Sequence, residues 1–512
     1  MIKGITRYPQ ITFLLIVAIF GGYAMMPSLS NSWVNWDDPA YVLENPLLDD
    51  FSLIGISSIF NATEVKGAYH PLTILSYSLD KHFSDFNPWF YHAHNLLLHL
   101  LNSVLAYWFV WILSRKIFLT IVVSLLFDVH LMHVKSVAWV SARKDVLYTA
   151  YFMMSLITWI SYIRTSGRSK LLYLVSFFLF MLSSLSKPMA MTLPGILLLL
   201  DYFEKRTIWQ RLMVEKLPFL IISFIVGVMA IRTQQLAGDM GELIDLKWSQ
   251  SIVFGLHGLL IYLVKSVIPF GLSGFYPYPD FEVNEIPWYM TFSIVPLALL
   301  ASVIWFKFRS KRSVIFGFLF FSITIGPALQ FISFGNAIVS ERFTYVPFIG
   351  LFFVSAILLN WLYVKIRPFR KVAFNPSCRH SGVYNRIVSN RKTRCSIWKD
   401  NISLWTDVIE EYPNDHLAYC NRATTHGKQG DLGLALNDCI NCINLNSDLP
   451  ESFNNRGMTL AAMGKLQDAL SDFDKALTLD SRYITALVNR AGIFMQTDRF
   501  DLARQDLEKA SQ

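Results

Sequence analysis

Charged residues are scarce in this 512-residue chain: Asp, Glu, Lys and Arg together make up 16% of it, against about 25% in a soluble globular domain. Hydrophobic residues make up 53% and aromatic residues 15%. This composition argues against a soluble enzyme. It also excludes a disordered or nucleic-acid-coating protein, because both classes need low hydrophobicity and dense charge. We therefore expect an integral membrane protein whose partners include the lipid bilayer and no nucleic acid.

Cysteine is absent from the first 377 residues, and the five that follow are Cys378, Cys395, Cys420, Cys439 and Cys442. The absence excludes a disulfide framework from the apolar part of the chain, and the odd count argues against one in the remainder. Cys439 and Cys442 form a CxxC pair, a pattern that also occurs in redox and zinc sites. We predict that both are core residues, since free cysteine packs as a small hydrophobic side chain.

Long apolar stretches are abundant in residues 1–363, which we predict to be a polytopic all-α membrane domain. A bilayer core of about 30 Å needs about 20 apolar residues per helix. The predicted spans are 11–26, 91–113, 117–133, 145–163, 171–186, 188–203, 217–232, 251–270, 289–306, 313–334 and 343–363. Basic clusters after several of them mark the cytoplasmic side. With 11–26 as an uncleaved span rather than a signal peptide, residues 27–90 form a large first external loop. Ten or eleven spans result, because the short pair around Lys187 need not cross fully.

The rest of the chain differs in composition. Residues 364–399 form a basic linker. Between 365 and 396 there are nine Lys or Arg residues and no Asp or Glu, so this segment alone contributes the positive excess behind the chain's net charge of +8. We interpret it as a solvated tether, with binding to anionic lipid headgroups as the alternative. In residues 400–512, Asn421-Arg422, Asn455-Arg456 and Asn489-Arg490 recur every 34 residues. That period predicts about three tetratricopeptide (TPR) repeats in an α-solenoid, whose groove binds a protein partner.

The first external loop holds the leading candidates for chemistry. Asp37 and Asp38 are adjacent carboxylates, which raise each other's pKa, and a partly desolvated carboxylate can act as a general base. The alternative is that an Asp caps a turn or helix ahead of Pro39. His130 and His133 lie on one helical face, but no further ligand completes a metal site, and participation of a divalent metal stays open.

Charged residues beside the predicted spans form a second group of candidates. Arg143-Lys144-Asp145 and Arg342 lie at span ends, and an ionisable group at membrane depth is costly and usually faces a cavity. If they are external, the basic residues suit an anionic headgroup such as a lipid phosphate. The alternative is a local ion pair, for example between Asp145 and a neighbouring Arg.

Several short motifs follow one another along the chain. In order they are Asn35-Trp36-Asp37-Asp38-Pro39, His70-Pro71-Leu72-Thr73, Asn95-Leu96-Leu97-Leu98-His99, Arg143-Lys144-Asp145, Leu185-Ser186-Lys187-Pro188, Phe275-Tyr276-Pro277-Tyr278-Pro279 and Arg342-Phe343-Thr344-Tyr345. In this order they resemble the bacterial TPR-bearing relatives of the transmembrane-and-TPR O-mannosyltransferases, which have the C-type glycosyltransferase architecture. The resemblance implies transfer of a sugar such as mannose from a polyprenyl-phosphate carrier to Ser or Thr of an acceptor protein, at the external face of the bacterial inner membrane. No cofactor beyond that donor is implied.

The resemblance also assigns roles to individual residues. It implies that Asp37 or Asp38 is the catalytic carboxylate that deprotonates the acceptor hydroxyl. The carrier phosphate would be bound by a set of basic residues, namely His70, Arg143, Lys144, Lys187 and Arg342.

Three features depart from the family pattern. Where the relatives carry Glu, this chain has Lys135 and Ala142. The basic linker also stands where the relatives have a last hydrophobic span, and we interpret it as a local replacement of sequence. As the sequence reads, this linker leaves the TPR repeats cytoplasmic, whereas the resemblance predicts that they are extracytoplasmic. The alternative function is therefore a catalytically impaired membrane scaffold that binds a partner protein through its TPR groove.

Overall fold

The computed structural model describes residues 17, 19–62, 65, 67–206, 209–236, 248–278, 286–331, 337–366 and 389–511. Residues 11–16 and 18 of the predicted span 11–26, and most of the basic linker, lie outside the described residues. Within these ranges the chain is all-α, as predicted, and forms no β-strand. It divides into two compact units. Unit 1 comprises Met1–Leu272 and Tyr278–Lys399, and unit 2 comprises Ser273–Pro277 and Asp400–Gln512.

The segment of unit 1 that we predict to be the first external loop is a folded element. It contains a π-helical turn, η2 (Pro39–Leu43), and two helices, α3 (Leu53–Asn61) and α4 (Pro71–Ser84). The hydroxyl of Ser52 caps α3 by accepting a hydrogen bond from the Gly55 amide. A buried apolar cluster fixes the loop against the following helix; it includes Tyr41, Val42, Ile74, Tyr77 and Tyr91.

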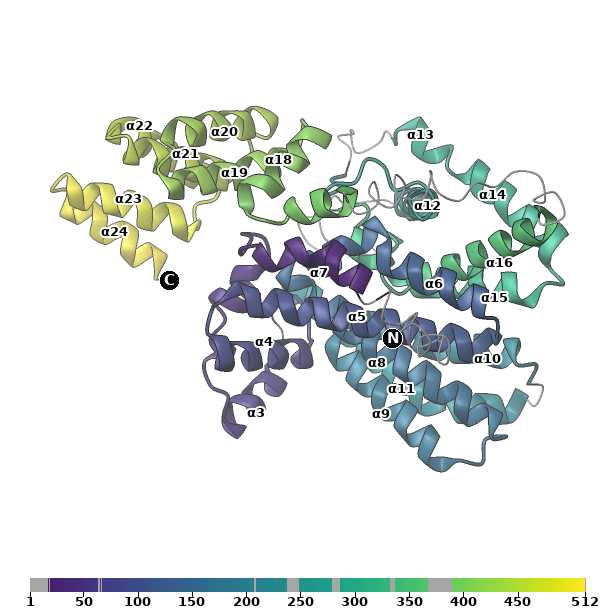
Figure 1. Ribbon diagram of the computed structural model, residues 1–512. Helices are drawn as coiled ribbons and strands as arrows, with labels where there is room; N and C mark the ends of the chain where they lie inside the picture. Colours follow the sequence, from purple (N-terminus) through teal and green to yellow (C-terminus); the bar gives the residue numbers. More distant parts are fainter. Residues whose placement is uncertain are drawn as a thin grey trace, which may run out of the picture. The chain divides into compact units, whose positions relative to one another are not determined.

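The long helices of unit 1 follow in chain order (Figure 1): α5 (Pro88–Ser114), α6 (Ile117–Val129), α8 (Arg143–Arg164), α9 (Lys170–Ser186), α10 (Leu193–Phe203), α11 (Trp209–Leu236), α12 (Trp248–Lys265), α14 (Ile294–Val303), α15 (Arg312–Ile325) and α16 (Phe348–Ile366). Two short helices, α7 (Val134–Ala138) and α13 (Trp288–Thr291), lie between them. Small residues allow close packing: a Cβ at Gly317 of α15 would lie only 2.7 Å from the carbonyl oxygen of Gly350 in α16.

Fewer helices than predicted are long enough to cross a membrane. By length and composition there are five among the described residues, Pro88–Ser114, Val140–Arg164, Met213–Gln235, Trp288–Phe308 and Phe348–Lys365. A sixth results if Ile117–Val129 and Leu131–Ala138, bent by 54°, are one broken span. The spans predicted at 171–186, 188–203 and 313–334 coincide with apolar helices of at most 17 residues. A helix of that length measures about 26 Å, less than a bilayer core of about 30 Å.

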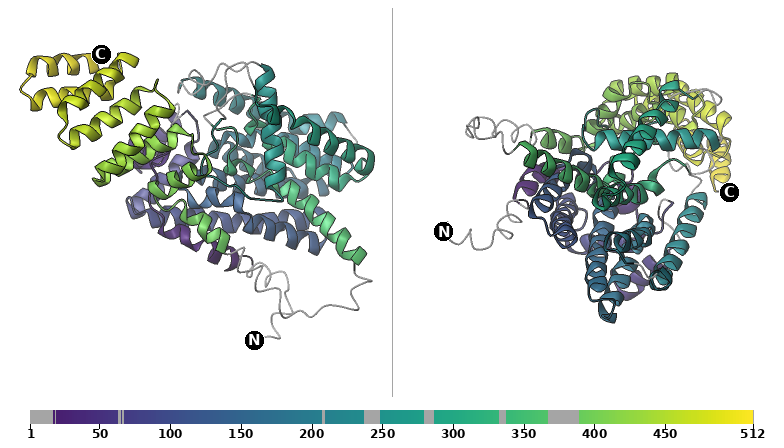
Figure 2. Two further views of the ribbon diagram at one scale, coloured as in Figure 1. Left: turned by 90° about the horizontal axis from the view of Figure 1, so that it is seen from above. Right: turned by 90° about the vertical axis from the view of Figure 1, so that its right-hand side faces the viewer.

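Unit 2 is built from antiparallel helix pairs (Figures 1 and 2). After α18 (Asn401–Glu411) come α19 (His416–Gln429) with α20 (Leu432–Leu445), α21 (Pro450–Ala462) with α22 (Leu466–Leu479), and α23 (Ile484–Gln496) with α24 (Phe500–Ala510). One bidentate ion pair recurs in each helix pair, with N···O distances of 2.6 to 2.9 Å: Arg422–Asp438, Arg456–Asp472 and Arg490–Asp506. The 34-residue sequence period is thus the period of the helix pairs.

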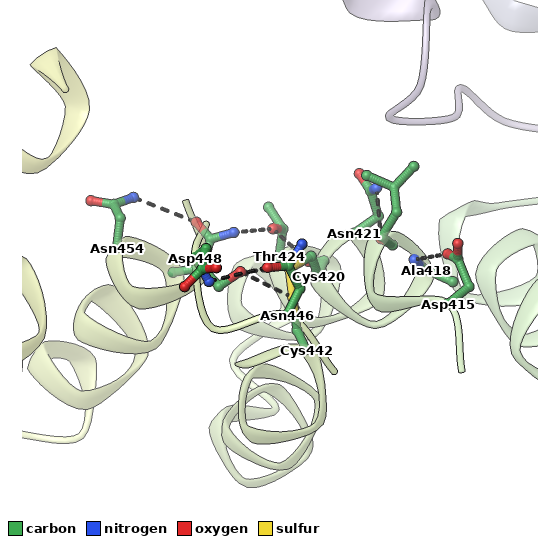
Figure 3. Close-up of a disulfide and its surroundings, with 12 residues drawn as sticks. Asp415, Ala418, Cys420, Asn421, Thr424, Cys442, Asn446, Asp448 and Asn454 are labelled. Atoms are coloured by element: carbon green, nitrogen blue, oxygen red, sulfur yellow. Dashed lines mark hydrogen bonds between the residues drawn. A yellow bond between two sulfur atoms is a disulfide. The ribbon is translucent and has the colours of Figure 1, made fainter. Parts of the chain in front are cut away.

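A disulfide joins the two helices of the first pair (Figure 3). Cys420 of α19 and Cys442 of α20 are bonded, with their Cα atoms 5.5 Å apart. The prediction that the odd cysteine count argues against a disulfide was therefore wrong. An odd number of cysteines is compatible with a disulfide because some of them can stay unpaired, and Cys395 and Cys439 are buried free thiols. Cys439 and Cys442 are core residues, as predicted, but Cys442 is not a free thiol.

Candidate functional site

Asp38 is fully buried and joins two distant parts of unit 1. Its carboxylate accepts hydrogen bonds from the amide of Val34 at 2.9 Å, from the amide of Ser141 at 3.1 Å and from the Ser141 hydroxyl. Burial raises the pKa of Asp38 to about 6, and the bonds from Ser141 and Val34 limit that rise. The side chain makes no capping bond to η2, which begins at Pro39. The interpretation of Asp38 as a helix cap is therefore wrong, because its carboxylate is bonded to Val34 and Ser141 instead.

Asp37 lies between two basic side chains from distant segments. Its Oδ2 is 3.8 Å from the Nζ of Lys144, at the start of α8, and 3.8 Å from Nη1 of Arg342. Arg342 belongs to the 3-10 turn η9 (Glu341–Thr344). Its guanidinium packs over the rings of Trp139 and Phe343, with Cζ 5.2 and 5.4 Å from the two ring centroids. The Nε and Nη1 atoms of Arg342 are buried and make no hydrogen bond among the described residues.

Tyr41 connects Lys144 with His70. The Nζ of Lys144 donates to the Tyr41 hydroxyl at 3.1 Å and lies 4.2 Å from the ring centroid. His70 also lies against that ring, with 5.1 Å between ring centroids. Both ring nitrogens of His70 are buried without a hydrogen bond among the described residues. Burial, followed by the charge of Lys144, holds the pKa of His70 well below its usual value, so the ring is neutral at pH 7.

Lys187 completes a set of three basic residues, Lys144, Lys187 and Arg342, which we call the cation cluster. Its ammonium pairs with the Asp145 carboxylate and lies 5.0 Å from the centroid of the Phe343 ring, next to Arg342. The hydroxyl of Thr73, three residues after His70, donates to the carbonyl of Ser186 at 2.8 Å. The ion pair predicted for Asp145 thus exists, but its partner is Lys187, 42 positions away, and not a neighbouring Arg.

Arg143 is separate from the cation cluster. It is fully buried, and its guanidinium donates to the Asn95 side chain at 2.8 Å and to the carbonyls of Ser76 and Tyr91. It also forms an ion pair with Asp80. Every nitrogen of the guanidinium is therefore engaged within the protein, which indicates a structural role for Arg143. Five of the other predicted site residues are linked to one another by the contacts above, namely Asp37, His70, Lys144, Lys187 and Arg342, and the sixth, Asp38, is bonded to Val34 and Ser141.

Lys135 is enclosed by three indole rings. Its Nζ lies 4.7, 5.4 and 5.3 Å from the ring centroids of Trp36, Trp139 and Trp398. Trp139 and Trp398 are stacked, with centroids 5.3 Å apart and an interplanar angle of 20°. Cation–π attraction to several rings in a desolvated cage is worth about 2 kcal/mol or more. The cage joins the first external loop, through Trp36, to two other segments of unit 1.

The last residues of unit 1 contact the segments around Ser32 and Glu341. Arg394 forms an ion pair of 3.0 Å with Glu341, the neighbour of Arg342. The amide of Ser32 donates to the carbonyl of Lys399 at 2.8 Å. Lys399, the last residue of unit 1, is therefore held next to Ser32, five positions before Asp37.

Some of these contacts could not be found from the sequence. Tyr41 and Ser141 contact site residues that lie 103 positions away in the chain, and no local pattern marks them. Among the described residues, no three His, Cys, Asp or Glu side chains gather as metal ligands. His130 and His133 pack against aromatic rings, including Phe348 and Phe352.

Comparison with known proteins relates the chain to two groups. The tetratricopeptide repeat family matches residues 450–483. The chain is similar to human protein O-mannosyl-transferase TMTC2, with 35% identity over 102 residues, which cover 20% of this chain and 12% of that protein. For human protein O-mannosyl-transferase TMTC1 the identity is 32% over 149 residues, or 27% of this chain and 17% of that protein. For human tetratricopeptide repeat protein 6 it is 27% over 158 residues, or 31% and 27%.

The matches span about a quarter or less of the length of these relatives. They support homology to TPR-bearing O-mannosyl-transferases over part of the chain, and the repeat supports protein–protein interaction. Together with the five apolar helices, they also support a membrane location.

Proposed function

We propose that this protein is a membrane-embedded hexosyltransferase that moves a sugar, such as mannose, from a polyprenyl-phosphate carrier to Ser or Thr of an acceptor protein. The observation that carries the proposal is the position of Asp37, 3.8 Å from both Lys144 and Arg342. A carboxylate between two partly buried cations suits this reaction. The acceptor must lose a proton while a phosphate leaves with negative charge.

The residues of the site take different parts in the transfer reaction. The acceptor oxygen attacks the anomeric carbon of the sugar and gives its proton to the Asp37 carboxylate. The bond from that carbon to the phosphate oxygen breaks, and its electron pair leaves with the polyprenyl phosphate. Lys144, Lys187 and Arg342 stabilise the departing anion, while neutral His70 donates its one ring N–H to a phosphate or sugar oxygen. Asp38, bonded to Val34 and Ser141, positions Asp37.

Two observations favour an extracytoplasmic position for the repeats over the cytoplasmic one. Lys399, the last residue of unit 1, is bonded to Ser32, in the segment that carries Asp37 and that we expect to be external. The Cys420–Cys442 disulfide requires an oxidising compartment. In bacteria that compartment is the outer face of the inner membrane, where we expect the TPR groove to bind acceptor proteins.

A second candidate function is a membrane scaffold without transferase activity. It is favoured by Lys135, whose positive charge stands where the family pattern has Glu. In that case the function of the protein is to bind a partner protein in its TPR groove.

The two functions are separated by a transfer assay on the full chain in lipid nanodiscs. We expect a Ser/Thr peptide to gain one hexose mass when polyprenyl-phosphate mannose is supplied. Replacement of Arg342 by Gln should slow transfer about 100- to 1,000-fold, the effect of losing one preorganised charge donor. The matched control is Arg309→Gln, at an exposed position between α14 and α15. If the folded wild-type protein transfers none of a panel of polyprenyl-phosphate hexoses, the scaffold is the better account.

A further inference from the structure

The described end of the basic linker is packed into unit 1. Residues 389–396 are helical and belong to that unit. Arg391, Arg394 and Cys395 lie on one face of this helical stretch, and all three are buried. The thiol of Cys395 contacts the Sδ atom of Met25 at 3.5 Å. This part of the linker is therefore a packed element, in contrast to the solvated tether predicted from its composition.

Arg394 binds two segments that are distant from it in the sequence. Its Nη1 donates to the Leu272 carbonyl at 3.0 Å, and its Nη2 donates to Oε1 of Glu341 at 3.0 Å. The side chain of Arg394 is only 7% exposed, and that of Glu341 is 0% exposed. A carboxylate that is fully removed from water needs a cation and hydrogen-bond donors close to it, because burial of an unpaired charge is costly. Arg394 provides both to Glu341.

Glu341 directly precedes Arg342 in the turn η9, and the two side chains carry opposite charges. Arg342 is the residue whose Nη1 lies 3.8 Å from the Asp37 carboxylate. The charges of Arg342, Glu341 and Arg394 all act on the buried ammonium of Lys135, so these groups lie in one electrostatic neighbourhood. Because Coulomb attraction is strong where water is excluded, an unneutralised Glu341 would draw a neighbouring cation toward itself. Arg394 prevents this by pairing with Glu341.

The backbone that leads into η9 has a separate anchor. The hydroxyl of Tyr262 accepts from the Ser340 amide at 2.8 Å and donates to the Ser340 carbonyl at 3.3 Å. This anchor does not involve Arg394, so we expect the turn to keep its place when Arg394 is replaced. The main effect of such a replacement then falls on the charges beside Arg342.

We infer that Arg394 is a positioning residue, which neutralises Glu341 and thereby leaves the Arg342 guanidinium directed at Asp37 and at the phosphate of the donor. This inference rests on the proposed function, which supplies the phosphate. The described end of the basic linker is thus part of the donor site. A carboxylate can then stand next to Arg342 without cancelling its charge. An ion pair with a purely structural role would instead affect the stability of the fold and leave Arg342 unchanged.

The direct test follows the reactivity of Arg342 toward phenylglyoxal in the full chain in nanodiscs, with the labelling rate measured by peptide mapping. The side chain of Arg342 is 21% exposed. We expect Arg394→Gln to slow the labelling about tenfold, because Arg342 then gains a charge-assisted bond to Glu341 that is worth this factor. A second substitution, Glu341→Gln, should restore the rate. The matched control is Lys399→Gln, which removes one positive charge at an exposed position and should leave the rate unchanged.

Two results of the labelling experiment would overturn the role of Arg394. The first is unchanged labelling of Arg342 in folded Arg394→Gln protein. If that variant does not fold, the comparison is made in the Glu341→Gln background, where replacement of Arg394 should no longer affect Arg342. Slower labelling in this background is the second contradicting result, since it would show that Arg394 does not act through Glu341.

Transfer kinetics give a second readout. We expect kcat/KM for polyprenyl-phosphate mannose to fall about tenfold in Arg394→Gln and to recover when Glu341→Gln is added. A lower melting temperature with unchanged labelling and unchanged kcat/KM would assign the ion pair a structural role alone. Because labelling needs no turnover, the two proposals fail separately. Altered labelling without transfer by the wild type rejects the proposed function, whereas transfer with unaltered labelling rejects the role of Arg394.

Discussion

The carboxylate of Asp38 accepts hydrogen bonds from both the backbone amide and the hydroxyl of Ser141, 103 positions later in the chain. This contact holds the first external loop against the segment that leads into α8, and so brings Asp37 within reach of Lys144. It also opposes the rise in the Asp38 pKa that burial causes. The Ser141 hydroxyl therefore tunes the protonation of the carboxylate beside the proposed base.

Ser141→Ala should move the acid limb of the rate profile to higher pH. Asp38 has a pKa of about 6, and the Ser141 hydroxyl lowers it, so loss of that donor raises the pKa above this value. Because ionised Asp38 is expected to position Asp37, the rate of hexosyl transfer then falls at a higher pH than in the wild type. The measurement is kcat against pH between 5 and 8. Ser136→Ala is the control, since Ser136 is buried and its hydroxyl makes no hydrogen bond among the described residues. Coincident profiles for Ser141→Ala and the wild type would contradict this role.

Substitution of Arg143 should affect folding rather than donor binding. Arg143→Gln leaves the partly buried Asp80 carboxylate without its cation, and breaking a buried pair costs about 3 kcal/mol or more. Thermal unfolding in detergent measures the loss. Arg164→Gln breaks a more exposed pair with Glu204 and should cost less than about 1 kcal/mol. Unchanged melting of Arg143→Gln with a raised KM for the donor would instead assign Arg143 to the phosphate.

Restoring the residue of the family pattern at position 135 should destabilise this chain. Lys135→Glu exchanges a cation for a carboxylate among three indoles. The substitution removes the cation–π attraction to the three rings, worth about 2 kcal/mol or more. The expected result is a lower melting temperature and a changed near-ultraviolet circular dichroism signal from Trp139 and Trp398. Lys311→Glu, at an exposed position, should leave both unchanged. A stable Lys135→Glu protein with faster transfer would show that Lys135 impairs the site.

The Cys420–Cys442 disulfide should be present in protein isolated with its thiols blocked. Its cysteines are separated by 22 residues, and closing a loop of that size stabilises by about 3 kcal/mol. Peptide mapping without reductant should find the linked pair, and Cys420→Ser with Cys442→Ser should melt earlier. Cys439→Ala removes a buried free thiol and serves as the comparison. Full alkylation of both cysteines in the native protein would contradict the extracytoplasmic position.

The helical repeats and the fold class could be predicted from the sequence because both follow from local periodicity. The different contacts of neighbouring residues could not be predicted from the sequence. Arg143 and Lys144 are adjacent on a helix, where successive side chains point about 100° apart. Only the tertiary structure shows that Lys144 faces Asp37 while Arg143 faces Asp80. Similarly, Asp37 and Asp38 carry the same group, and the long-range contact with Ser141 distinguishes them. Pairing of Cys420 with Cys442 rather than Cys439 likewise depends on which turn of α20 faces α19.

In the proposed mechanism Asp37 is the base and Asp38 holds it in place. Single-turnover transfer from polyprenyl-phosphate mannose to a Ser/Thr peptide tests this most directly, with Asp37→Asn, Asp38→Asn and the wild type compared at pH 7. We predict that Asp37→Asn loses at least 100-fold in rate while binding of the donor is retained, since general-base catalysis contributes typically 10² to 10⁴-fold. Asp38→Asn, which keeps an acceptor oxygen for Ser141, should retain more activity than Asp37→Asn. Wild-type rates in Asp37→Asn, or a larger loss in Asp38→Asn than in Asp37→Asn, would contradict the account.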